Sequence, residues 1–162
     1  MIQEFRKVQL PSGIAGQLFL HSMPGRRENW EEFETELEAK QIDVIACLNA
    51  FEEIEEKSPV YASVLKEGTL TVGWVGFPIP DFGTPEYPKA FSGFVGTLAK
   101  ILSGGNTLLL HCAGGVGRTG MTGILLLRYL GMVTEDACQA IRNARSEPDT
   151  GKQYTLCSSE II

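Results

Sequence analysis

The chain has few of the features that mark secreted or metal-binding proteins. Its 162 residues include only 4 cysteines and 2 histidines. The cysteines lie far apart and form no Cys-x-x-Cys motif, and no His/Asp cluster has the spacing of metal ligands. These absences argue against a disulfide framework. We therefore expect reduced thiols in a cytoplasmic protein that needs no metal and no cofactor.

Long apolar runs and an excess of positive charge are also missing. No apolar run approaches the roughly 20 residues that span a membrane, and residues 1–6 lack the apolar core of a signal peptide. The formal net charge is −6, with acidic clusters at Glu31-Glu32 and across residues 52–56. This balance gives no support to a nucleic-acid or membrane partner, so any basic site must be local.

The order of the expected elements favours one α/β domain over residues 1–162, which is long enough for a hydrophobic core. A hairpin is expected over residues 6–21. Further strands are expected at 42–48, 69–75 and 106–111, and helices at 28–40, 59–66, 87–102, 118–130 and from Thr134, which we expect to cap its helix. The pattern predicts a mostly parallel central sheet of about five strands, flanked by helices.

One glycine-rich stretch, residues 111–120, joins an apolar strand to a helical pattern and reads His-Cys-Ala-Gly-Gly-Val-Gly-Arg-Thr-Gly. The N–H groups of such a loop and of a helix N-terminus bind anions. Arg118 adds a planar set of donors suited to phosphate, and the positive field favours a thiolate at Cys112. The stretch predicts an oxyanion-binding loop between a central strand and a helix, with a nucleophile at its floor. The expected substrate-binding residues are Ala113, Gly114, Gly115, Val116, Gly117 and Arg118.

Other readings of this loop fit less well. Gly115–Gly120 matches G-x-G-x-x-G, but a dinucleotide fold would need a second parallel strand and a later acidic residue, and the chain after Gly120 is helical in pattern. The nucleotide-binding P-loop needs a lysine, and this loop has none. A tight turn with an inert cysteine would leave the coincidence of Cys112, Arg118 and four glycines unexplained.

A second loop supplies the acid that the chemistry needs. Residues 77–85 read Phe-Pro-Ile-Pro-Asp-Phe-Gly-Thr-Pro, a pattern of turns that comes after the strand at 69–75. In α/β sheets the ligand crevice lies at the carboxyl ends of the strands, so Asp81 and Cys112 are expected to share one crevice. Asp81 is then the general acid and later the base, beside Phe82 as a supporting residue.

His111-Cys112-x-x-Gly115-x-x-Arg118-Thr119-Gly120 resembles the signature of the cysteine-dependent tyrosine and dual-specificity phosphatases. The resemblance implies a protein tyrosine phosphatase-like fold and hydrolysis through a phosphocysteine intermediate. It also implies that His111 hydrogen-bonds loop carbonyls and helps to keep the thiolate, and that the Thr119 hydroxyl stabilises the cysteine as a leaving group.

Two further motifs make the resemblance closest to the kinase-associated phosphatases, which act on cyclin-dependent kinases. These are Pro-Ile-x-Asp-x-Gly-Thr-Pro around Asp81 and Thr-x-Lys-Gln-Tyr at residues 150–154. Small prokaryotic dual-specificity-like phosphatases share the loop. Gln153, in the second motif, resembles the glutamine that positions the hydrolytic water.

The loop composition favours a singly phosphorylated protein side chain, because none of its variable positions, Ala113, Gly114 and Val116, is basic. We expect a monomeric phosphatase acting on phosphotyrosine, and on phosphoserine and phosphothreonine, with a phosphorylated protein such as a kinase as partner. His21 is expected to be structural. The pair Arg26-Arg27 is expected on the solvated surface, with contact to a substrate phosphate as the alternative. The alternatives are a phosphoinositide or other non-protein phosphate monoesterase, a phosphate-binding pseudophosphatase, and arsenate or sulfur chemistry through the same Cys-x5-Arg core.

Overall fold

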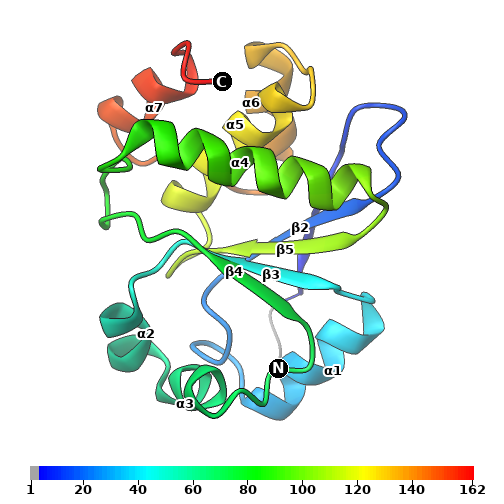
Figure 1. Cartoon of the computed structure of the whole chain (residues 1–162), viewed down its shortest axis with the longest axis vertical. Coiled ribbons are helices and arrows are strands. Elements are labelled where there is room, and N and C mark those ends of the chain that lie inside the picture. The colour runs from blue at the N-terminus through cyan, green and yellow to red at the C-terminus, as the bar shows by residue number, and fades with distance from the viewer. Residues whose placement is uncertain (1–3) are drawn as a thin grey trace.

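Five strands form one sheet in the order β1-β2-β5-β3-β4 in the computed structural model, which describes residues 4–162 (Figure 1). Residues 1–3, part of the segment that lacks the core of a signal peptide, lie outside the described residues. β1 pairs antiparallel with β2, and the other three neighbouring pairs are parallel. The prediction of a mostly parallel sheet is confirmed. The strands are β1 (Arg6–Val8), β2 (Gln17–His21), β3 (Val44–Cys47), β4 (Gly73–Gly76) and β5 (Thr107–His111).

Helices cover both faces of this sheet over residues 4–162 (Figure 1). On one face lie α1 (Trp30–Ala39), α2 (Phe51–Lys57) and α3 (Pro59–Glu67). On the other lie α4 (Pro88–Ser103), α5 (Gly117–Tyr129), α6 (Thr134–Asn143) and α7 (Gly151–Cys157). Within the same residues, no helix combines the length and apolarity needed to cross a membrane.

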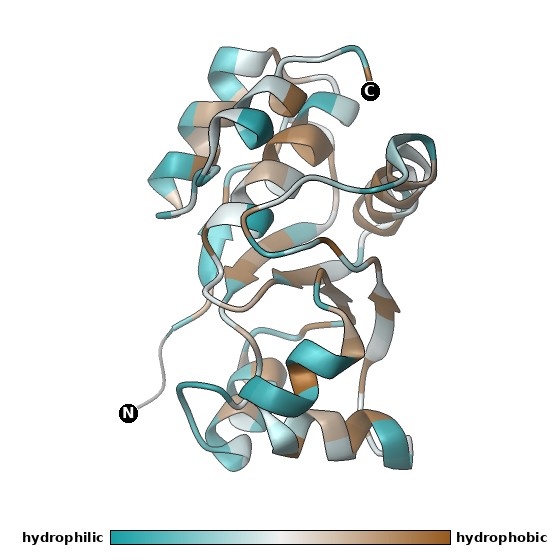
Figure 2. Ribbon diagram, turned by 90° about the vertical axis from the view of Figure 1, so that its left-hand side faces the viewer, coloured by the Kyte–Doolittle hydropathy of each residue, from teal (hydrophilic) through white to brown (hydrophobic). Residues whose placement is uncertain are grey.

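The central strand β5 is buried on both sides because helices cover both faces. Leu108 and Leu110 belong to the apolar cluster that includes α4 and α5, whereas Leu109 packs in the cluster that includes α1. Each such leucine contributes about 1.5–3 kcal/mol through burial. Figure 2 shows the result as brown strands between helices that carry teal, hydrophilic residues. The continuous apolar run in the sequence therefore follows from two-sided burial.

Two local expectations are wrong. The strand expected at 69–75 is shorter and later, because pairing of β4 with β3 starts only where Val44 faces Gly73. Thr134 does not cap α6: it is already the first helical residue, and the N-cap is Val133, which has an extended backbone. A capping side chain must come from such a non-helical residue, so the threonine hydroxyl is placed too late to serve.

The parallel strands bring the two predicted loops to one edge. β3, β4 and β5 run in the same direction, with Cys47 level with both Gly76 and His111. Their carboxyl ends lie at the left of Figure 1, where α2 begins, the segment between β4 and α4 passes, and the chain enters α5. This edge is where an α/β sheet binds its ligands.

Candidate active site

The loop of residues 112–116 connects β5 to α5 and is held from behind by its carbonyl groups. The Gly115 carbonyl accepts hydrogen bonds from Arg6 Nη2 at 2.7 Å and Ser146 Oγ at 2.6 Å. The Ala113 carbonyl accepts from the Met23 N–H at 3.1 Å. Gly115 has φ +75°, and a Cβ there would lie 2.5 Å from the carbonyl oxygen of His21, so this position requires glycine.

The N–H groups of this loop, unlike its carbonyl groups, are not hydrogen-bonded to the rest of the described chain. Among the described residues, the N–H groups of residues 113–116 donate to no backbone or side-chain acceptor. Successive free N–H groups beside a helix N-terminus form a site for an oxyanion. The bonds to the carbonyls and the free N–H groups together give a preorganised anion-binding loop around Cys112, which is only 3% exposed.

Arg118, in the first turn of α5, is held in place by carboxylates. Its Nη1 and Nη2 donate to the two oxygens of Glu53 at 2.8 and 2.9 Å, and Nη1 also donates to the Ile79 carbonyl at 3.0 Å. Nη2 lies 3.3 Å from Asp81 Oδ1. This paired, bidentate geometry fixes the plane of the guanidinium. The Arg118 contact lowers the pKa of Glu53 to about 2.

Cys112 and Asp81 line the same pocket, as the sequence predicted for their crevice. The pocket has a volume of about 220 Å³. Phe82 lies beside Asp81 on the exposed tip of its loop, with φ +58° and 61% exposure. The lining residues are Arg26, Lys57, Asp81, Phe82, Cys112, Ala113, Gly114, Val116, Gly117, Arg118 and Asp149. The residues predicted as nucleophile, anion-binding groups and acid thus line one small pocket.

A larger pocket of about 410 Å³ lies elsewhere and suits a phosphate poorly. Its lining includes Glu34, Glu38 and Asp43, and it has neither a lysine nor an arginine nor a cysteine. A dianionic ligand would meet like charge there without compensation. Size alone would therefore point to the wrong site.

His111 lies under the loop in a chain of hydrogen bonds. Burial lowers its pKa to about 3, so the ring is neutral. Because Nδ1 faces the Cys112 carbonyl at 3.0 Å it carries the proton, and Nε2, at 2.9 Å, accepts from the Tyr61 hydroxyl. Trp74 Nε1 in turn donates to Tyr61 at 2.9 Å. The ring thus bonds to the carbonyl of Cys112 itself.

The other two residues predicted from the sequence, Thr119 and Gln153, differ in whether their polar groups have hydrogen-bond partners. The Thr119 hydroxyl is buried and has no hydrogen-bond partner among the described residues. Gln153 is fully buried and does not line the pocket. Its Nε2 donates to the Gly83 carbonyl at 2.9 Å, and its Oε1 accepts from the Asp149 N–H at 2.7 Å. Its amide therefore connects the Asp81 loop to the segment before α7.

Arg26, expected on the surface with phosphate contact as the alternative, lines the pocket. Several other residues at the site were not identified from the sequence. Lys57 lines the pocket, and its Nζ lies 4.0 Å from Asp81 Oδ2. Glu53 was one acid in an acidic stretch, and Arg6 was one basic residue in a hairpin. Only the i,i+4 spacing of Glu53 and Lys57 was visible in the sequence, where it is typical of any solvated helix.

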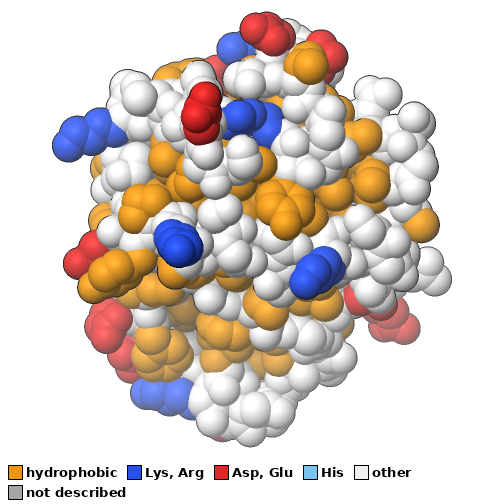
Figure 3. All heavy atoms as spheres, turned by 45° about the horizontal axis from the view of Figure 1, so that its top comes forward, with side chains coloured by type: hydrophobic (Ala, Val, Ile, Leu, Met, Phe, Trp, Pro, Cys, Tyr) orange, Lys and Arg blue, Asp and Glu red, His pale blue; other side chains and the backbone are white. Residues whose placement is uncertain are grey.

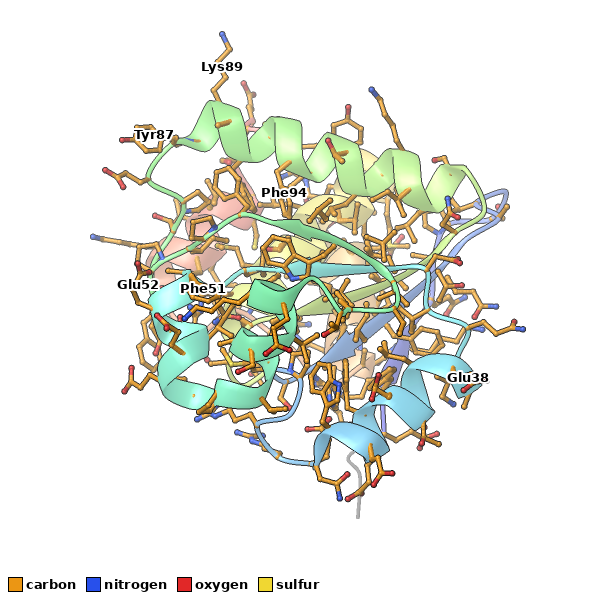
Figure 4. The ribbon with its side chains drawn as sticks, turned by 60° about the horizontal axis from the view of Figure 1, so that its bottom comes forward. Glu38, Phe51, Glu52, Tyr87, Lys89 and Phe94 are labelled. Atoms are coloured by element: carbon orange, nitrogen blue, oxygen red, sulfur yellow. The ribbon has the colours of Figure 1, made fainter. Side chains whose placement is uncertain are left out.

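Figure 4 locates the segments around this edge. Phe51 and Glu52, at the start of α2, lie on the same side of the molecule as Tyr87 and Lys89, at the start of α4, and Glu38 in α1 lies far from them. Tyr87 is 66% exposed. Phe94 points into the body of the protein, with its ring centroid 5.4 Å from that of Phe77. The Asp81 segment thus runs from a packed start at Phe77 to an exposed end at Tyr87.

The fold and the site together define the class of cysteine-dependent phosphatases, in which a Cys-x5-Arg loop follows a central parallel strand. Comparison with known families agrees. Residues 21–131 match the family Tc-R-P, described as "Polymorphic toxin system, DSP-PTPase phosphatase". This match covers more than half of the chain, and the chain belongs to this family of dual-specificity and tyrosine phosphatases.

Individual relatives are more distant. The chain is 35% identical to rat (Rattus norvegicus) cyclin-dependent kinase inhibitor 3 over 81 residues, which are 48% of this chain and 38% of that protein. It is 29% identical over 100 residues to 067L of Invertebrate iridescent virus 3, provisionally named a tyrosine phosphatase, covering 60% of this chain and 38% of the viral one. The matches therefore span less than two fifths of the length of these curated relatives.

Among solved structures, the fold is similar to that of kinase associated phosphatase carrying a catalytic cysteine-to-serine substitution. The TM-score is 0.82 at 22% identity, with 97% of this chain and 93% of that chain covered. At this identity the likeness shows the fold alone.

Proposed function

We propose that residues 1–162 act as one catalytic domain that hydrolyses phosphate monoesters on proteins: phosphotyrosine, and also phosphoserine and phosphothreonine. The observation that carries the proposal is the pocket lined by Cys112, by Arg118 and Asp81, and by three loop residues with free N–H groups, Ala113, Gly114 and Val116. Phosphoryl transfer needs mainly positioning and stabilisation of charge, and this pocket offers both.

In the first step the Cys112 thiolate attacks phosphorus in line with the leaving oxygen. The loop N–H groups and Arg118 hold the three equatorial oxygens as charge spreads over them. Asp81 gives its proton to the leaving oxygen. The Sγ–P bond forms as the P–O bond breaks, which leaves a phosphocysteine and a free hydroxyl compound.

In the second step water attacks the phosphocysteine. Asp81, now ionised, takes a proton from the water, and Cys112 leaves as a thiolate. The buried Thr119 hydroxyl has no hydrogen-bond partner within residues 4–162 and can donate to the departing sulfur. His111, bonded to the Cys112 carbonyl, keeps the loop in place from below.

A protein substrate is supported by the loop and by the rim of the pocket. The loop side chains are not basic, which suits one phosphate group rather than several. Phe82 and Val116, 61% and 37% exposed, line the pocket and offer apolar contact to an aromatic side chain. On the face shown in Figure 3, Lys and Arg side chains stand apart rather than forming one continuous patch. We further propose that the protein is a cytoplasmic monomer.

Phosphorylated kinases are the first protein substrates to test, because relatives are named kinase associated phosphatase and cyclin-dependent kinase inhibitor 3. A panel should compare a kinase phosphorylated on its activation segment with unrelated phosphoproteins and phosphoinositides. Release of phosphate from phosphoinositides in preference to phosphoproteins would contradict the protein-substrate part of the proposal.

The decisive experiment measures hydrolysis of an aryl phosphate and of a phosphotyrosine peptide by the wild type and by Cys112→Ser. We expect saturable phosphate release by the wild type and a loss on the order of 10⁴-fold or more in the variant. Cys112→Ser should still bind inorganic phosphate, because the loop N–H groups and Arg118 remain. Inactive wild type, or an active variant, would refute the proposed chemistry.

A further inference from the structure

The resemblance implies that Gln153 positions the hydrolytic water, but in this structure its amide is bonded elsewhere. Both polar atoms of the Gln153 amide are hydrogen-bonded within the protein, and the side chain is fully buried away from the pocket. To face a water molecule in the pocket it would have to turn out of this buried position, at a cost of about 1–3 kcal/mol for each group left unsatisfied. A side chain that already lines the pocket is therefore better placed to face the water.

Asp149 is a polar side chain that could face this water. It lines the pocket together with Cys112 and Asp81. Its carboxylate lies directly against Gly117, the first residue of α5, where any Cβ would collide with it. Its backbone N–H is the group that Gln153 Oε1 accepts from, so Gln153 fixes the bend that carries Asp149.

The Asp149 carboxylate is not used to hold the described part of the fold together. Within residues 4–162 it makes no hydrogen bond and no ion pair, although it lies at the anion-binding end of α5. Burial and the nearby Asp81 raise its pKa, Arg118 opposes the rise, and Glu147 adds to it. A carboxylate with unused lone pairs in the pocket that holds Cys112 is a ready acceptor for water.

We propose that Asp149 orients the water that hydrolyses the phosphocysteine, with Gln153 as the positioning residue behind it; this inference rests on the proposed function. The water has two O–H groups. One gives its proton to the ionised Asp81, and the other donates a hydrogen bond to the Asp149 carboxylate. The water oxygen forms the new P–O bond as the P–Sγ bond breaks, which releases inorganic phosphate and the Cys112 thiolate.

The two carboxylates suit this order of events. During attack on the substrate Asp81 holds a proton, so the pair carries one negative charge. Once Asp81 has given that proton to the leaving group, two like charges face each other across a small pocket. Uptake of a proton by Asp81 from the attacking water relieves this repulsion. Asp149 thus acts in the second step and has little to do in the first.

This separation of steps gives the test. Asp149→Ala is compared with the wild type on an aryl phosphate, with and without glycerol as a competing acceptor for the phosphoryl group. We expect kcat to fall about tenfold or more and kcat/KM to stay within about threefold, because formation of the phosphocysteine is unaffected. A burst of the aryl alcohol should precede the steady state. With glycerol present, the variant should release more aryl alcohol than inorganic phosphate. Without Asp149 to orient water, part of the phosphoryl group should be transferred to glycerol instead.

Glu147→Gln is the matched control, since Glu147 is an exposed acid two residues away that does not line the Cys112 pocket. It should keep the wild-type ratio of aryl alcohol to phosphate. Asp149→Ser, at the same exposed bend, serves if the alanine variant unfolds. If kcat and kcat/KM fall together, without a burst and with equal release of alcohol and phosphate, the inference is wrong. If the wild type itself were inactive, the proposed phosphatase function would be wrong, which is a different outcome from failure of the Asp149 inference.

Discussion

The two loops that meet at the Cys112 pocket are built in opposite ways. The phosphate loop is buried: Cys112 is 3% and Arg118 2% exposed, and its carbonyls are bonded to β1 and to residues far along the chain. The backbone of the Asp81 loop is hydrogen-bonded at its ends, where Ile79 bonds to Leu48 and Arg118, and Gly83 bonds to Pro80 and Gln153. At the tip, the Asp81 side chain forms ion pairs with Arg118 and Lys57. Its tip, with Asp81 and Phe82, is exposed.

Because of this difference, we expect the phosphate loop to contribute to both stability and catalysis, and the tip of the Asp81 loop to contribute to catalysis alone. Groups that hold an anion must be preorganised, because their reorganisation would add to the barrier. A general acid needs only to reach the leaving oxygen, and a loop fixed at two ends allows this while the mouth stays open. Substitutions in the phosphate loop or behind it should therefore cost stability and activity together, and those at the Asp81 tip should cost activity alone.

Asp81→Asn is expected to show the largest difference between its effect on activity and its effect on stability. Loss of the proton donor should lower kcat/KM for a phosphotyrosine peptide by about 10²-fold or more. The free energy of unfolding should change by about 0.5 kcal/mol or less, because the side chain is half exposed. Rates measured across pH, with thermal unfolding of the same samples, check both parts. The variant should lose the requirement for a protonated acid, and an unchanged pH profile would place the acid on another residue.

Arg6→Met should affect both quantities. Arg6 is 8% exposed and donates to the carbonyls of Gly115, Ala144 and Arg145 and to Ser146 Oγ. Removing the guanidinium takes a donor from each of these acceptors, of which the Gly115 carbonyl keeps its bond from Ser146 Oγ. The loss should lower the free energy of unfolding by about 2–4 kcal/mol. The loosened loop should lower kcat/KM by roughly tenfold.

Lys7→Met is the matched control for Arg6, because Lys7 is exposed on the same strand. It should leave both quantities near the wild-type values. Equal losses in the two variants would mean that a general charge effect, rather than the bonds behind the loop, explains the result.

The acid stability of the protein should depend on Glu53. Contact with Arg118 lowers the folded-state pKa of Glu53 from 4.5 to about 2. A lowered pKa means that the ion pair stabilises the fold fully above about pH 4.5 and loses this contribution as pH falls towards 2. Glu53→Gln should cost on the order of 2 kcal/mol at pH 7 and should be less sensitive to pH in this range.

Urea unfolding at several values between pH 7 and pH 2 measures this effect. Glu52→Gln is the control, since Glu52 is the exposed neighbour in the same helical turn (Figure 4). Its stability should follow the wild-type curve. Parallel curves for Glu53→Gln and the wild type would refute the linkage.

The smallest effect is expected for Phe82→Asn at the tip of the Asp81 loop. Asparagine tolerates the positive φ of 58° better than phenylalanine does, so stability should change by no more than about 0.5 kcal/mol. The lost apolar contact should raise KM for a phosphotyrosine peptide by a few-fold at most. Peptide kinetics and thermal unfolding check this, and a large loss of stability would show that the tip is packed more firmly than its exposure indicates.

Much of the fold was predictable because its signals are local. The apolar runs around Ile45 and Leu109 indicate buried parallel strands, and the helix expected at 59–66 is present as α3. Element boundaries were less predictable. The start of β4 depends on pairing with β3, and the N-cap of α6 depends on the backbone of Val133, neither of which a local pattern encodes.

The sequence by itself determined the phosphate loop, since nucleophile, glycines and arginine are consecutive, and it indicated Asp81 through the turn residues around it. Only the tertiary structure decided what surrounds them. Arg6, Glu53 and Asp149 come from distant segments, and each is an ordinary charged residue until the fold brings it to the loop. Gln153 illustrates the limit: its motif is legible in the sequence, but the hydrogen bonds that occupy its amide depend on Gly83, 70 residues away.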